Sequence, residues 1–195
     1  MLFSDLALSR RLERAEGYAC VQFAKARRVL FPDSEADWLE YGGAYAGFSG
    51  VDSPVTQSFG LGLCEPLSSE TLDVMERFFE DHGAPVMHEV CPLAGVAALD
   101  LLCARGYRPI EISSVLYRTL EAQDSPEPEG IRVRAIGPEE MPLWAEVNAQ
   151  GWAQEHPEFL DFIREVGATS EATGEILLLI QRDEAERNFH CRRYH

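Results

Sequence analysis

Lysine is almost absent from this chain of 195 residues. Lys25 is the only one, so arginine supplies nearly all of the 17 positive charges, which face 33 carboxylates and leave a formal net charge of −16. A surface this acidic repels phosphate backbones, so the sequence predicts no nucleic-acid partner. A small amine is the kind of partner that the charge balance favours.

Long hydrophobic runs are missing as well. No segment approaches the roughly 18 apolar residues that a membrane span needs, and the N-terminal stretch becomes charged at Asp5 and Arg10, unlike a signal peptide. The five cysteines are odd in number and lack the spacing of a metal knuckle or a redox pair. We therefore expect a cytoplasmic protein with free thiols, without a membrane contact and without a metal.

The chain nevertheless has the composition of a folded protein, because 46% of its residues are hydrophobic. One acidic, proline-rich stretch without large apolar residues, 121–130, interrupts the pattern and predicts a linker. The sequence thus predicts a first module over residues 1–120 and a second over residues 131–195.

Apolar periodicity and turn residues predict the elements of the first module. We expect helices over 5–30, from Ser68 or Ser69 to Gly83 and over 94–104, a hairpin over 37–48 around Gly42–Gly43, and strands over 55–63, 85–90 and 109–118.

The second module is shorter. Strands are expected over 131–136 and 175–181 and helices over 138–151 and 158–166, whereas residues 182–195 show no clear period. Two strands cannot close a sheet, so the apolar residues Ile176–Ile180 are expected at or near an edge. A bare edge of this kind recruits a partner, so we expect this strand either to extend the sheet of the first module or to pair across a homodimer.

Three segments of the first module carry a resemblance to a known family. The run from Phe59 to Leu63 leads into a capped helix, Pro85–Cys91 follows as the next strand, and Leu99–Tyr107 ends a late helix in glycine and an aromatic residue. In these features the chain resembles the GNAT N-acetyltransferase superfamily, and in particular its tandem members. The resemblance implies an α+β fold with a GNAT-like mixed sheet flanked by helices, followed by a partial second module of the same kind.

The resemblance also implies an activity, the transfer of an acetyl group from acetyl-CoA to an amine. In the family, the pantetheine arm lies between the central strand and the next one. This assigns Phe59, Leu61, Gly62 and Leu63 to cofactor binding. Glu89 is the candidate catalytic base, because a carboxylate in this cleft can take a proton from an ammonium group. The alternative for Glu89 is a solvated or hydrogen-bonded edge residue.

The loop that binds the pyrophosphate departs from the family pattern. The family has Arg or Gln, then glycines, whereas residues 64–69 read Cys-Glu-Pro-Leu-Ser-Ser, and Leu102 stands where the family often has a tyrosine acid. A second hypothesis therefore stays open: a non-catalytic module that binds a small ligand or self-associates on the same fold.

Overall fold

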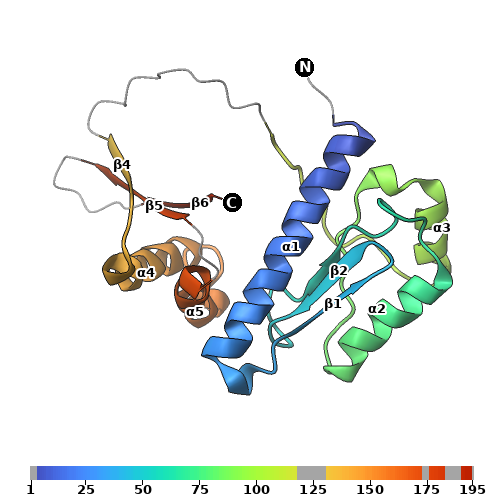
Figure 1. Cartoon of the computed structure of the whole chain (residues 1–195), viewed down its shortest axis with the longest axis horizontal. Coiled ribbons are helices and arrows are strands. Elements are labelled where there is room, and N and C mark those ends of the chain that lie inside the picture. Colours follow the sequence, from blue (N-terminus) through green and yellow to red (C-terminus); the bar gives the residue numbers. More distant parts are fainter. Residues whose placement is uncertain (1–3, 118–130, 173–175, 183–189, 195) are drawn as a thin grey trace. The chain divides into compact units, whose positions relative to one another are not determined.

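The computed structural model describes residues 4–117, 131–172, 176–182 and 190–194. The chain divides into two compact units, Met1–Ile110 and Glu111–His195 (Figure 1). Each unit combines helices with antiparallel strands, so the expected α+β class is confirmed. The linker expected over residues 121–130 lies outside the described residues.

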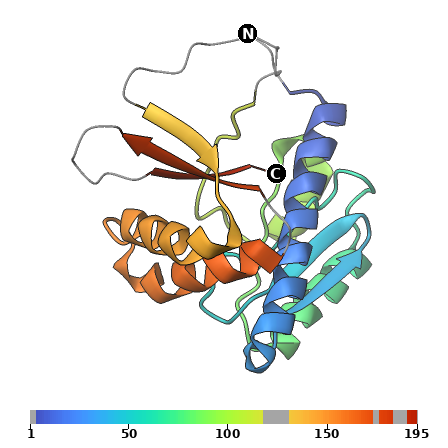
Figure 2. The ribbon, with the colours of Figure 1, turned by 60° about the vertical axis from the view of Figure 1, so that its left-hand side comes forward.

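A long helix opens the N-terminal unit. Helix α1 spans Leu6–Leu30, and its start is set by Asp5, whose carboxylate accepts a hydrogen bond of 2.8 Å from the backbone N–H of Leu8. Pro32 follows one residue after its cap and cannot continue the helix. The helix covers one face of a small sheet, and α2 covers the other (Figures 1 and 2).

The sheet has three antiparallel strands in the order β1-β2-β3, which are Asp37–Tyr41, Ala44–Phe48 and Gln57–Phe59. Gly42 and Gly43 form the turn between β1 and β2 with φ of 58° and 72°. Two consecutive positive φ angles are the signature of a tight type I′ hairpin, which glycine adopts without strain.

Helix α2, Ser69–Asp81, begins at Ser68, whose hydroxyl accepts a hydrogen bond from the backbone N–H of Thr71. Its apolar face packs on the sheet side opposite α1 and forms the main core. The buried members of this core are Ala44, Ala46, Phe48, Leu61, Leu72, Met75, Phe79, Ala84 and Leu102.

Helix α1 lies close to β2 because a glycine stands on one side of each of two contacts, Gly17 against Tyr45 and Gly47 against Cys20. A Cβ atom added to Gly17 would lie 2.6 Å from the ring of Tyr45, and one added to Gly47 would overlap the sulfur of Cys20. Neither glycine has a positive φ. The absence of a side chain, rather than backbone freedom, is therefore what these two positions require.

The strands that follow α2 are shorter than the sequence predicts. Strand β3 ends at Phe59 because Gly60, with φ of 81°, starts a turn. Residues 85–90 form only an isolated parallel bridge, in which His88 pairs with Ser58. Helix α3 spans Val96–Ala104 as expected, but residues 109–117 form no strand.

The C-terminal unit contains a second antiparallel sheet. Strands β4 (Ile131–Ala135), β5 (Ile176–Arg182) and β6 (His190–Tyr194) pair in that order, with helices α4 (Met141–Trp152) and α5 (Leu160–Ala172) between β4 and β5. Two expectations are therefore wrong. The tail contains a strand, and residues 176–180 lie at the centre of the sheet because β6 covers the edge they would otherwise present.

The close α1–β2 contact predicts the effect of adding one methyl group. We expect Gly47→Ala to lower the free energy of unfolding by about 1–3 kcal/mol, the usual cost of overpacking. Because the obstacle is the sulfur of Cys20, the same substitution should cost less in a Cys20→Ala background. Urea unfolding of all four proteins gives the coupling energy, and an equal cost in both backgrounds would contradict the contact.

Candidate functional site

The candidate site lies where β3 meets the segment that carries His88. The backbone N–H of Ser58 donates to the carbonyl of Met87 at 3.0 Å, and the N–H of Glu89 donates to the carbonyl of Ser58 at 2.9 Å. These two bonds hold the segments parallel for one residue pair. Beyond it, β3 turns away at Gly60.

His88 lies on the α2 side of this bridge. Its Nδ1 atom is 2.7 Å from the hydroxyl of Ser58, and its ring is 4.9 Å from the ring of Tyr107. Its Nε2 atom is buried and has no hydrogen-bond partner among the described residues. Burial lowers the pKa of His88 to about 4, so the ring is neutral near pH 7. Ser58 is fully buried, which makes the pair a structural connector rather than an exposed nucleophile.

Glu89 is the next residue, and its carboxylate faces a different neighbour. Its charge raises the pKa of Glu13, a residue of α1, although burial is the larger cause of that rise. The carboxylate of Glu13 accepts a hydrogen bond of 3.0 Å from the backbone N–H of Gly60, which acts in the opposite direction. The structure therefore brings together two half-buried carboxylates beside the turn at Gly60.

The four residues assigned to cofactor binding lie in and around that turn. Phe59, Leu61 and Leu63 are buried with exposed fractions of 5%, 1% and 2%, so their side chains belong to the interior. A Cβ atom on Gly62 would lie 3.2 Å from Ala94, which shows how tightly α3 and its entry pack on this turn.

Helix α1 holds the same turn through a second side chain. Arg10 donates a hydrogen bond of 2.6 Å from Nε to the carbonyl of Leu63, and the N–H of Leu63 donates to the carbonyl of Gly60 at 3.2 Å. Together with Glu13, which lies three residues further along the helix, Arg10 uses backbone groups of residues 60–63 that an extended ligand would otherwise bind.

The start of α2 offers little to an anion. Ser68 satisfies the N–H of Thr71, Glu70 lies in the first turn, and the preceding loop exposes Glu65 and Pro66. A helix N-terminus favours negative charge, but here the protein already supplies it.

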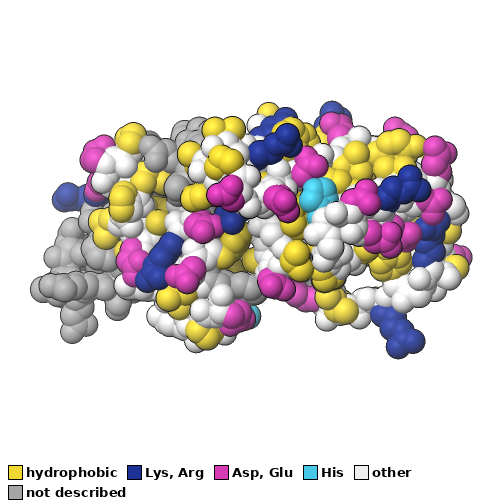
Figure 3. Space-filling model, turned by 90° about the horizontal axis from the view of Figure 1, so that it is seen from below, with side chains coloured by type: hydrophobic (Ala, Val, Ile, Leu, Met, Phe, Trp, Pro, Cys, Tyr) yellow, Lys and Arg dark blue, Asp and Glu magenta, His cyan; other side chains and the backbone are white. Residues whose placement is uncertain are grey.

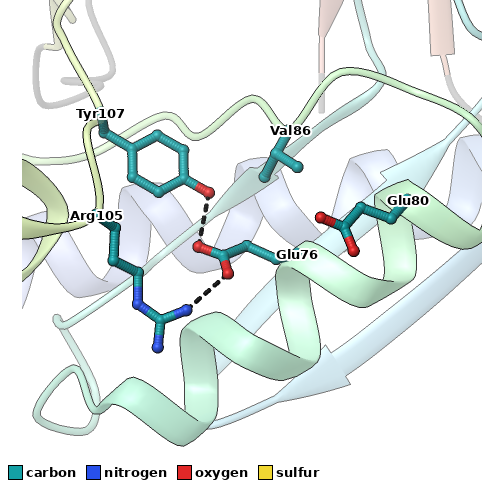
Figure 4. A pocket seen from close by; sticks show the side chains of 5 residues that line it. All are labelled: Glu76, Glu80, Val86, Arg105 and Tyr107. Carbon is teal, nitrogen blue, oxygen red and sulfur yellow. Dashed lines mark hydrogen bonds and ion pairs between the residues drawn. The ribbon is translucent and has the colours of Figure 1, made fainter.

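A shallow pocket of about 430 Å³ lies on the outer side of α2 (Figure 4). Tyr107 and Arg105 both point toward Glu76, which accepts hydrogen bonds of 3.0 Å from the Tyr107 hydroxyl and 2.6 Å from Arg105 Nη1. Arg105 also pairs with Asp73 at 2.7 Å. Burial and the bond to Glu76 raise the pKa of Tyr107. These bonds tie the end of α3 to α2, which is a structural role.

One face of the molecule shows how its charged side chains are distributed. On the face in Figure 3, acidic side chains are scattered among apolar and basic ones. Within the described ranges, no group of three or more His, Cys, Asp or Glu side chains could hold a metal ion. No helix among the residues described is long and apolar enough to cross a membrane.

Comparison of the chain with family models, with curated proteins and with solved structures finds no match in any of the three. The site must therefore be interpreted from its own geometry.

Glu13 is the site residue that the sequence analysis does not identify. In the sequence it is one of several charged residues on the polar face of a helix. Its spacing of three residues from Arg10 places both side chains on one face of the helix. The sequence does not show that this face contacts the turn at Gly60. Glu89, in contrast, is identified by its place on the strand.

The buried neutral His88 predicts a dependence of stability on pH. Its pKa of about 4 lies below the value of 6.5 for a free imidazole, so as the pH falls the unfolded chain takes up a proton at this residue before the folded protein does. The contribution of His88 to the free energy of unfolding is therefore largest above pH 6.5 and is lost as the pH falls toward 4. The shift corresponds to about 3 kcal/mol. We expect the free energy of unfolding to fall less over this range in His88→Gln, which keeps a hydrogen-bonding group for Ser58 but does not titrate. Urea unfolding at several pH values measures the difference, and identical slopes for both proteins would argue against a buried neutral ring.

Proposed function

We propose that the N-terminal unit binds a small amine ligand on an acetyltransferase-like scaffold. The observation that carries the proposal is the pair of half-buried carboxylates, Glu13 and Glu89, beside the turn at Gly60. The two residues come from different segments of the chain. The carboxylate of Glu13 accepts a hydrogen bond from the N–H of Gly60, and the backbone N–H of Glu89 donates to the carbonyl of Ser58.

The electrostatics of this pair favour a cation. Two carboxylates close together in a partly buried place repel each other, which is why the charge of Glu89 raises the pKa of Glu13. An ammonium group between them removes the repulsion and supplies hydrogen-bond donors to both. Binding should therefore strengthen as the pH rises through the titration of Glu13. The general acidity of the chain attracts the same kind of ligand.

The residues present do not fit acetyl-CoA. The N–H of Gly60 and the carbonyl of Leu63 are occupied by side chains of α1, so the pantetheine arm lacks the backbone partners that the family provides. The start of α2 has Glu65 and Glu70 where a pyrophosphate needs donors and cations. For this reason we prefer a binding module to a working transferase.

Acetyl transfer to an amine is the second candidate. It is favoured by one observation, the parallel bridge between Ser58 and His88 that opens immediately at Gly60. This divergence agrees with the splayed pair of strands that the resemblance implies. In that case Glu89 would accept the proton of the ammonium group.

The amine proposal predicts that neutralising either carboxylate weakens binding. With spermidine as the probe, we expect Glu89→Gln and Glu13→Gln each to lower the affinity at least tenfold while the fold is kept. Asp81→Asn, which removes one exposed charge at the end of α2, is the matched control and should change the affinity little. Isothermal titration calorimetry measures all four proteins. If Asp81→Asn lowered the affinity for spermidine as much as the two Glu→Gln variants, net charge alone would attract the amine. If Glu89→Gln left the affinity unchanged, Glu89 would not belong to the site.

Because the groups that would bind acetyl-CoA are occupied or replaced by carboxylates, we expect no measurable affinity for acetyl-CoA at micromolar concentration. Each missing charge-assisted hydrogen bond costs roughly 1.5–3 kcal/mol, so two or three of them lower the affinity by a factor on the order of a thousand or more. We also expect no acetyl transfer to polyamines. Calorimetry that detects a tight one-to-one complex with acetyl-CoA would favour the second candidate over the first.

A further inference from the structure

Strand β1 is an open edge of the N-terminal sheet. It pairs with β2 and with no other described strand. In a hairpin with a two-residue turn, the residues that flank the turn exchange backbone hydrogen bonds and the pattern then alternates. Since Tyr41 pairs with Ala44 and Leu39 with Ala46, the backbone groups of Trp38 and Glu40 point away from β2.

Two cations surround the side chain of Trp38. The Nζ atom of Lys25 and the guanidinium carbon of Arg28 each lie 5.2 Å from the centre of the Trp38 ring. Both come from α1, so the Trp38 side chain lies on the α1 side of the sheet. The Nη1 atom of Arg28 also lies 3.1 Å from the carboxylate of Asp37, whereas Lys25 forms no ion pair among the described residues. This cationic aromatic surface, formed by Lys25, Arg28 and Trp38, lies directly beside the open edge.

Glu40 lies two residues from Trp38 and therefore on the same face. Burial raises the pKa of Tyr45, the charge of Glu40 and its hydrogen bond to Tyr45 raise this pKa further, and Arg14 lowers it. Tyr45 contacts α1 through Gly17. Glu40 is exposed. Leu39 and Tyr41 point the other way and pack against the core beneath α2. The strand thus carries a cationic surface and a carboxylate on one face, and on the other face Leu39 and Tyr41 together with Asp37, which lies 3.5 Å from His82 Nε2.

We propose that β1 pairs with β1 of a second copy of this chain, antiparallel and centred on Leu39. This register places Trp38 opposite Glu40 of the second copy, and Glu40 opposite Trp38 of the second copy. Opposite residues of an antiparallel pair share one face, so each carboxylate meets the Lys25–Arg28–Trp38 surface of the other chain. The outward backbone groups of Trp38 and Glu40 then form hydrogen bonds across the dimer.

Strand β1 carries both the cationic surface at Trp38 and the carboxylate of Glu40 that complements it. A second copy of the chain therefore fits this edge. An unrelated peptide would need an acidic residue at one position, whereas β1 itself supplies it at the spacing that a two-fold axis requires. The same axis places Leu39 next to Leu39 of the second copy and Asp37 opposite Tyr41 of the second copy. This interface is independent of the amine site and uses none of its residues.

Sedimentation equilibrium of the full chain over a range of concentrations tests the proposal. We expect a dimer whose dissociation constant rises at least tenfold in Glu40→Lys, which places like charges opposite each other. Asp100→Lys makes the same charge change at an exposed position of α3 and should leave the dissociation constant within about twofold. Lys25→Glu combined with Glu40→Lys should recover part of the lost affinity.

Amide hydrogen exchange provides a second measurement that does not depend on any variant. The N–H groups of Trp38 and Glu40 should exchange more slowly as the wild-type protein becomes more concentrated, while the amides of the exposed loop residues Val51 and Asp52 should not change. A monomer at all concentrations, an equal loss of association in both charge variants, or a dimer without protection at Trp38 and Glu40 would overturn the proposal. Slower exchange at Trp38 only on addition of an acidic peptide, with the protein still monomeric, would assign the edge to a different occupant and would also overturn it.

Discussion

The close contact between α1 and β2 determines where most functional groups of the N-terminal unit lie. Gly17 leaves room for the ring of Tyr45, and Gly47 leaves room for Cys20, so the helix backbone rests almost directly on the strand. A helix held this close cannot slide along the sheet without a steric clash. Its register decides which side chains reach the turn at residues 60–63 and which reach Trp38.

Two ends of the same helix therefore act at two different places. Near its start, Arg10 and Glu13 bind backbone groups of the turn after β3. Near its end, Lys25 and Arg28 lie over Trp38 of β1. Burial makes ionised Glu13 costly, and the N–H of Gly60 offsets part of that cost. A shift by one helical turn would remove all of these contacts together.

The features that the sequence predicts well are those with local causes. Asp5 and Ser68 cap helices through their own neighbouring N–H groups, and Gly42–Gly43 makes the hairpin turn without help from distant residues. Strands fail more often, because a strand exists only where another segment pairs with it. Residues 109–117 have a suitable alternation but no paired neighbour in the described chain, whereas β6, at His190–Tyr194, lacks a clear pattern and pairs with β5. The role of Glu13 is likewise invisible until the turn at Gly60 is placed beside it.

His88 and Glu89 are neighbours in an extended segment, so their side chains point to opposite faces of the sheet. His88 lies on the α2 side, where burial keeps it neutral against Ser58 and Tyr107, and this side becomes core. Glu89 acts on Glu13, a residue of α1. Helix α1 carries six of the 17 positive charges but only two carboxylates, so among the helices that the structure describes it is the strongly basic one. The carboxylate of Glu40 also lies on this side, beside Tyr45. Both the amine site and the proposed dimer edge therefore use side chains on the α1 side of the sheet.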